Sequence, residues 1–173
     1  MVMQAEKTQA PQLVDLPAQT MAVVQTVGDP SRLDPAFVGA LYGAVYGLKF
    51  ALKAQGRAFK VAPLRARWPD AHLVPREQWT GLWALPVPDD TTALPQKNPA
   101  VQVRLERWEY GRVAQILHLG PFSTEAGSIV RLHQFVAEHG YVINGMHEEE
   151  YLTRPTAKTQ KTIIRYPVVK AAL

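Results

Sequence analysis

The sequence predicts an α+β fold made of two repeated strand–helix–strand–strand units. Two long helical patterns, each ended by a glycine, predict the helices, and each follows a strand-like segment that also ends at a glycine. The chain has 173 residues and no Cys, so it is long enough to bury a core and has no disulfide framework. We therefore expect a single domain over residues 1–173, with halves at about 13–88 and 101–170 joined by a linker over 89–100.

The first half begins with a β-branched segment, Thr20–Val27, which ends in a Gly-Asp-Pro turn and is predicted to be a strand. An Asp-Pro start and apolar residues at helical spacing predict a helix from about Pro35 to Gln55, and Gly56 is its expected stop. Two strands should follow, at Phe59–Trp68 and Trp79–Val87.

The second half repeats this plan after the proline-rich linker. A hairpin is predicted from Val101–Glu109 and Arg112–Leu119, which flank a Tyr-Gly turn. A helix should run from an N-cap at Ser123 or Thr124 to His139, and it is about two turns shorter than the first helix. The last predicted strands are Tyr141–Ile143, His147–Thr153 and Thr162–Val168.

The composition excludes several classes of protein. A net charge of +4, from 19 Lys and Arg spread along the chain against 15 Asp and Glu, does not favour a nucleic-acid interface. No segment reaches the roughly 18 apolar residues of a membrane span, and the N-terminus has no signal-peptide pattern. We expect a cytoplasmic protein with no membrane or nucleic-acid partner.

The acidic run that follows Met146 is the most unusual stretch of the sequence. On a strand, His147, Glu149 and Tyr151 share one face, while Glu148 and Glu150 share the other, and either face could be the inner one. A buried carboxylate there would have a raised pKa unless hydrogen-bond donors or a cation kept it ionised, and it could act as a cation receptor or a general base. The alternative is an exposed strand edge kept soluble by charge.

No metal site or cofactor is predicted. The pair His147-Glu148 resembles the start of a His-Glu-x-x-His zinc helix, but Tyr151 occupies the position of the second His. The other four His residues have no ligand-like spacing, and the chain has no Gly-rich phosphate loop.

Aromatic residues form the second notable feature, because three pairs are each expected to share one face of an element. A wall of Trp and Tyr rings beside a carboxylate is suited to a flat, aromatic or cationic organic molecule. The alternative for each ring is ordinary core packing. The predicted ligand-binding pairs are Trp79 with Trp83, Trp108 with Tyr110, and Tyr42 with Tyr46.

Several segments in a fixed order carry a resemblance to a known family: 41–53, 59–64, 76–79, 114–122, 131–135, and 145–152 with Arg154-Pro155. On these segments the chain resembles the GyrI-like small-molecule-binding family in its stand-alone form. The resemblance implies a SOUL/GyrI-type fold, in which two βαββ units with pseudo-twofold symmetry form antiparallel sheets, two long helices and a central ligand cleft. The repeated strand–helix–strand–strand plan agrees with this fold, since pockets favour such junctions.

The resemblance also implies roles for individual residues. In the family's His-Glu-x-Tyr-Leu stretch the glutamate two positions before the tyrosine faces the cleft, which makes Glu149 and Tyr151 the expected catalytic residues, with His147 beside them. Many stand-alone members carry a second Trp two residues after the first, where this chain has Gly81. The aromatic wall is therefore expected to differ, with Trp83 as a candidate replacement.

Two functional hypotheses follow from the resemblance. In the first, the multidrug-binding members of this bacterial family imply a receptor for flat aromatic or cationic compounds. The family's detoxifying members imply a hydrolase that opens cyclopropane-bearing alkylating toxins, with Glu149 as general base. In the second, the protein acts through a protein partner such as gyrase, without turnover of a small molecule. The net charge of +4 does not suit DNA mimicry.

Overall fold

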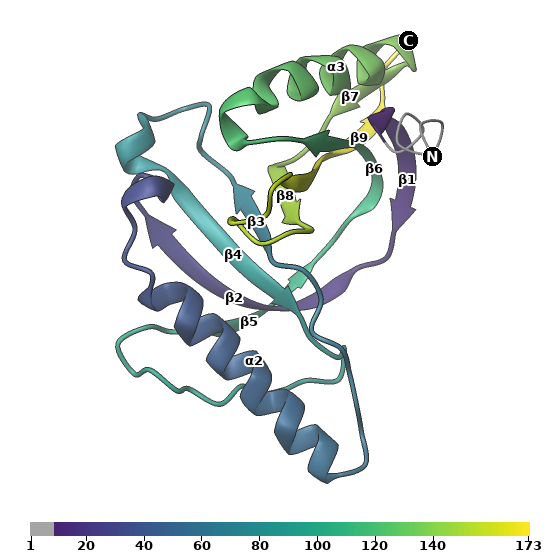
Figure 1. The fold of residues 1–173 in the computed structure, drawn as a ribbon. Helices are drawn as coiled ribbons and strands as arrows, with labels where there is room; N and C mark the ends of the chain where they lie inside the picture. Colours follow the sequence, from purple (N-terminus) through teal and green to yellow (C-terminus); the bar gives the residue numbers. More distant parts are fainter. Residues whose placement is uncertain (1–8) are drawn as a thin grey trace. The chain divides into compact units, whose positions relative to one another are not determined.

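The computed structural model describes residues 9–173, which form two compact units (Figure 1). One unit is Ala18–Glu109, and the other combines the segment that ends at Pro17 with Tyr110–Leu173. Each has antiparallel strands and a long helix, so the predicted α+β class is confirmed. The expectation of no targeting segment falls largely on residues 1–8, which lie outside the described residues.

The Ala18–Glu109 unit is a sheet with strand order β3-β4-β2-β5 and the helix α2. In the β2–β4 pair, Val24 lies opposite Trp83, and in the β2–β5 pair, Ala22 lies opposite Leu105. The elements are β2 (Gln19–Val27), α2 (Ala36–Ala54), β3 (Arg65–Trp68), β4 (Thr80–Pro86) and β5 (Arg104–Trp108), with 3-10 turns η1 (Pro30–Arg32) and η2 (Arg76–Gln78).

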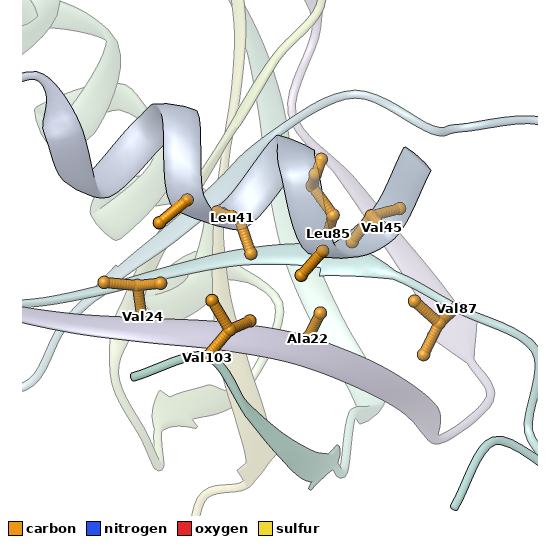
Figure 2. Close-up of a cluster of buried hydrophobic side chains, with 9 residues drawn as sticks. Ala22, Val24, Leu41, Val45, Leu85, Val87 and Val103 are labelled. Carbon is orange, nitrogen blue, oxygen red and sulfur yellow. The ribbon is translucent and has the colours of Figure 1, made fainter. Parts of the chain in front are cut away.

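The core of this unit lies between α2 and the sheet (Figure 2). Helix α2 buries Leu41 and Val45 one turn apart, and their side chains point toward apolar residues of the strands. Full burial of each such side chain stabilises the fold by about 1.5–3 kcal/mol. The remaining buried members of the cluster are Ala22, Val24, Ala40, Ala44, Leu85, Val87 and Val103.

The second unit is a sheet with strand order β1-β6-β9-β8 and the helix α3, and β7 also pairs with β9. Its elements are β1 (Gln12–Leu16), β6 (Gly111–Leu119), the 3-10 turn η3 (Phe122–Thr124), α3 (Glu125–Glu138), β7 (Tyr141–Ile143), β8 (His147–Tyr151) and β9 (Lys161–Lys170). Its core contains Ala114, Ile116, Leu132, Val136, Ile164, Tyr166 and Val168. Neither α2 nor α3, the long helices of the described residues, is sufficiently extended and apolar to cross a membrane.

Both units follow one plan, as the sequence repeat predicted. The strands that precede the helices, β2 and β6, pair with β4 and β9, which in turn pair with β3 and β8, giving β2-β4-β3 and β6-β9-β8. Both helices end at a glycine in the left-handed region, Gly56 with φ 77° and Gly140 with φ 75°. The two predicted helices agree with α2 and α3 to within one or two residues at each end.

The predicted hairpin of Val101–Glu109 with Arg112–Leu119 was wrong. The two strands form as β5 and β6, but β5 pairs with β2, whereas β6 pairs with β1 and β9. Thus β1, which comes just before β2 in sequence, pairs with β6 of the second unit. Likewise β5, which comes just before β6, pairs with β2 of the Ala18–Glu109 unit. Local turn signals predict only neighbouring pairs, so they could not indicate this exchange of β1 and β5.

Two further segments differ from the sequence expectations. The strand predicted over Phe59–Trp68 is reduced to β3, and Phe59, Val61 and Leu64 pack on the core from an irregular segment. Part of the predicted linker is also fixed to this unit, because Leu94 packs against the same core. The Gln96 side chain both donates to and accepts from the Val103 backbone, at 2.8 and 3.1 Å.

Glycines of α2 allow the segment that contains Pro95 and Lys97 to pass close to the helix, which we can test. A Cβ at Gly47 would lie 2.8 Å from Pro95 Cγ, whereas a Cβ at Gly39 would meet nothing within 4 Å. Gly47→Ala should therefore lower the free energy of unfolding by about 1–3 kcal/mol through overpacking. Gly39→Ala should raise it by about 0.5–1 kcal/mol through helix propensity. Urea unfolding of both variants measures the difference, and equal effects would contradict the close approach.

Candidate functional site

Strand β8 carries the acidic run of the sequence, and its glutamates are buried on both faces. Pairing with β9 sets the alternation, with Glu149 opposite Ile164 and Tyr151 opposite Thr162. Glu148 is 1% exposed and Glu149 is 6% exposed. The alternative of a solvated strand edge is therefore wrong, and each carboxylate needs a partner.

On one face of β8, Arg165 holds Glu148 and Glu150. The Arg165 guanidinium, 4% exposed, donates to Glu148 at 2.7 Å and to Glu150 at 2.6 Å, and the Tyr110 hydroxyl donates to Glu148 at 2.9 Å. Burial would lower the pKa of Arg165, but the two carboxylates outweigh it and raise that pKa. This face is a paired ionic network whose role is structural.

On the other face, Glu149 lies between His147 and Tyr151. The Nε2 atom of His147 lies 2.9 Å from Glu149 Oε1, and the Tyr151 hydroxyl donates to Glu149 Oε2 at 2.6 Å. The Tyr151 ring in turn meets the ring of Phe122 edge-on, at 5.7 Å between centroids. Each carboxylate oxygen thus has a donor, while aromatic rings form part of the surroundings.

Tyr166 on β9 fixes the orientation of the His147 ring. A carboxylate only accepts, so Nε2 of His147 carries a hydrogen, and in the neutral ring Nδ1 accepts from the Tyr166 hydroxyl at 2.6 Å. The chain Tyr166–His147–Glu149 is an orienting arrangement of the kind that positions bases and metal ligands in enzymes.

Glu125, the first residue of α3, adds a second carboxyl group to this cluster. Its side chain interacts with Glu149 and contributes to the lowered pKa of that carboxyl group. Burial alone would raise the pKa of Glu149, but the hydrogen bonds and charge of His147, with help from Tyr151 and Glu125, lower it. Hydrogen-bond donors therefore hold the buried carboxylate of Glu149 ionised.

The carboxylates of this cluster also affect the pKa of Tyr166. Burial, followed by the negative charges of Glu149 and Glu125, raises the pKa of Tyr166 to about 12. On the far side of this phenol, the His133 ring lies edge-on at 5.1 Å, and burial lowers the pKa of His133. Tyr166 therefore stays protonated at neutral pH and keeps donating.

Chemically, this cluster presents an ionised carboxylate with little exposure to water beside phenol and imidazole rings. Such a group attracts an organic cation strongly, because the surrounding dielectric constant is low. It can also take a proton from a water molecule. Among residues 9–173, no set of His, Asp and Glu side chains is arranged to hold a metal ion.

In the Ala18–Glu109 unit, the predicted pair Trp79 and Trp83 meets at a third ring. Trp68 lies 5.8 Å from Trp79 and 5.2 Å from Trp83 between centroids, and the Trp83 Nε1–H donates to Thr26 at 2.9 Å. Trp79 itself stands just before β4 rather than within it. A Cβ at Gly81 would come within 2.8 Å of Trp83 Nε1 and 3.1 Å of Trp68, so this position must stay small for the cluster to form.

The other two predicted aromatic pairs lie in different settings. Tyr42 and Tyr46 stack along α2 with 6.4 Å between ring centroids, and Tyr46 is 40% exposed. Trp108 is buried under the Arg67 guanidinium, 4.0 Å from its ring centroid. Tyr110 is buried as well, donating to Glu148 rather than to a ligand face.

The structure thus brings the predicted residues together in two groups. One contains His147, Glu149 and Tyr151, and the other contains Trp79 and Trp83 in the other unit. A single cleft that both groups line stays a prediction.

Sequence reasoning missed Glu125, Tyr166 and Trp68. Ala66 and Trp68 are two positions apart, as are Ile164 and Tyr166, so the members of each pair share one face of their strand. Nothing local, however, indicated which other element that face meets.

Comparison with known proteins assigns this arrangement to a family. The model of the GyrI-like small molecule binding domain matches residues 9–168, nearly the whole chain. The chain belongs to this GyrI-like family. No curated protein matches it.

Solved structures support the fold of this GyrI-like domain. An uncharacterized conserved protein from Listeria innocua shares 27% identity with a TM-score of 0.81, over 96% of this chain and 98% of that one. A hydrolase from Listeria innocua shares 27% identity with a TM-score of 0.78, over the same shares of the two chains. The C-terminal domain of EcmrR, at 17% identity and a TM-score of 0.67 over 93% and 98%, shares the fold.

The buried ion pair between Glu148 of β8 and Arg165 of β9 makes a prediction for the stability of its unit. Arg165→Met leaves Glu148 buried without its cation and should lower the free energy of unfolding by about 3–5 kcal/mol. The matched control Arg112→Met breaks the exposed pair of Arg112 with Asp15 and should change it little. Urea unfolding compares the two variants, and similar losses would contradict a buried network.

The raised pKa of Tyr166 makes a prediction for alkaline pH. The pKa of the tyrosine is near 10 in the unfolded chain and about 12 in the folded one. The stability that protonated Tyr166 contributes is therefore complete below pH 10 and is lost as pH rises through 12. Between pH 9 and pH 11 the parent should lose about 1 kcal/mol more stability than Tyr166→Phe. Urea unfolding at both pH values tests this, and parallel losses would show that Tyr166 ionises normally.

Proposed function

We propose that this GyrI-like protein binds flat aromatic or cationic organic compounds and hydrolyses cyclopropane-bearing alkylating toxins, with Glu149 as the general base. The observation that carries the proposal is the buried carboxylate of Glu149, kept ionised by His147 and Tyr151. The family match supports binding of small molecules, and the likeness to a hydrolase from Listeria innocua supports turnover.

The geometry supports a base whose position is fixed before substrate arrives. Tyr166 orients His147, and His147 with Tyr151 holds the two oxygens of Glu149, so little reorganisation is needed when a proton moves. In the proposed step, Glu149 takes a proton from water while the oxygen of that water bonds to an electrophilic carbon of the substrate. For a cyclopropane-bearing alkylating compound, the strained carbon–carbon bond breaks and its electron pair moves into the conjugated ring system.

Glu125 completes the proposed mechanism. The Glu125 side chain interacts with Glu149 and helps to lower the pKa of Glu149. Glu149 is then ionised and faces the proton of water. A cationic group on the substrate would be attracted to the same carboxylate, and Phe122 and Tyr151 supply ring faces and edges for a flat compound.

The roles expected for Trp79 and Trp83 stay part of the proposal. Their rings, with that of Trp68, offer a large stacking area, and loss of one should weaken binding of a planar dye. Quenching of Trp fluorescence by the dye, compared between the parent and Trp79→Phe, measures this contribution directly.

Replacement of the proposed base tests the reaction. Glu149→Gln keeps the size and one acceptor but cannot take a proton, so hydrolysis of a cyclopropane-bearing substrate should fall by about 10²–10⁴-fold while binding of a planar cation is retained in part. Turnover is followed by chromatography of the ring-opened product, and binding by fluorescence.

The control is Glu138→Gln, which removes an exposed carboxylate from the far end of α3 and should leave turnover unchanged. Parent-level turnover by a folded Glu149→Gln protein would show that Glu149 is not the base. Loss of binding and turnover together, with the fold intact, would assign Glu149 to ligand binding alone.

A further inference from the structure

A second polar cluster lies where β6 leads into α3, and its side chains have no part in the site described above. His118 of β6 is 4% exposed, and both of its ring nitrogens have partners. Nδ1 lies 2.8 Å from the Ser128 hydroxyl of α3, and Nε2 lies 3.0 Å from the backbone carbonyl of Pro121. An imidazole between a hydroxyl and an acceptor is the arrangement of an activated nucleophile.

The direction of these hydrogen bonds follows from their chemistry. A carbonyl oxygen only accepts, so Nε2 of His118 carries the hydrogen, and Nδ1 of the neutral ring is left as an acceptor. The Ser128 hydroxyl therefore donates to Nδ1. The neighbouring Thr124 hydroxyl donates instead to the Pro121 carbonyl at 2.9 Å, which leaves Ser128 as the hydroxyl directed at the base.

The cluster opens onto a hollow of about 390 Å³, a volume in the usual range for small-ligand sites. Both His118 and Ser128 line this hollow, so the hydroxyl is within reach of a small ligand. Leu117 and Leu119 add apolar surface, and Arg131 stands one helical turn after Ser128 on the same face of α3. An exposed guanidinium at that position can stabilise negative charge that develops on a carbonyl oxygen near Ser128.

We propose that Ser128 is a nucleophile that accepts the acyl group of small carboxylic esters, with His118 as its base. The Ser128 oxygen bonds to the ester carbonyl carbon while Nδ1 of His118 takes the hydroxyl proton. The bond from the carbonyl carbon to the alcohol oxygen then breaks, and the alcohol leaves with that proton. Water attacks the acyl-serine in the same way, which releases the carboxylic acid and restores both residues.

The probe for this activity is p-nitrophenyl acetate, incubated with the full chain. The parent should release p-nitrophenolate and carry an acetyl group on the peptide that contains Ser128, identified by mass spectrometry. Ser128→Ala should lower the rate of release by about 10²-fold or more, and His118→Asn should do the same. The control Ser123→Ala removes an exposed hydroxyl from the adjacent turn and should match the parent.

Each outcome decides the assignment. Absence of acetyl from Ser128 in the folded parent overturns the proposal, as does parent-level release by folded Ser128→Ala or acetylation confined to lysines. If His118→Asn fails to fold, acetylation of Ser128 in the parent protein still tests whether Ser128 is the nucleophile. The activity is independent of the proposed function, because Glu149→Gln should retain acetylation of Ser128 and Ser128→Ala should retain Glu149-dependent turnover.

Discussion

The pairing of β8 with β9 is the constraint on which the candidate site depends. It fixes which glutamates of the acidic run face Arg165 and which one faces His147 and Tyr151. Because side chains alternate along a strand, a shift of one residue would place Glu149 against Arg165 and leave Glu148 and Glu150 buried among phenol and imidazole rings. The ionic network on one face therefore also specifies the position of the candidate carboxylate, Glu149, on the other.

The buried carboxylates on the two faces of β8 are stabilised in different ways. Arg165 supplies a full positive charge to Glu148 and Glu150, whereas Glu149 is held by hydrogen bonds from His147 and Tyr151. A carboxylate neutralised by a fixed arginine is not available to a ligand. Glu149 keeps its negative charge uncompensated by a permanent cation, which is what a receptor for cations or a base requires.

The sequence predicted the helices, the α+β class and the grouping of His147 with Glu149 and Tyr151, because these depend on periodicity within one element. It failed where the answer depended on contacts between distant segments. The strand partner of β5 lies in β2, the partner of Glu148 is Arg165, and Glu125 reaches Glu149 from another element. The local pattern around Glu149 was compatible with both a buried and an exposed strand, and only the resemblance to a known family favoured burial.

The exchange of β1 and β5 has a consequence for synthesis of the chain. Ala18–Glu109 is continuous in sequence, so its sheet can assemble as soon as β5 has left the ribosome. β1 is made first but pairs with β6, more than ninety positions later, as Gln12 opposite Gln115 shows. The earliest strand to emerge must therefore wait unpaired while the intervening unit folds, and closing that long loop is an entropic barrier late in maturation.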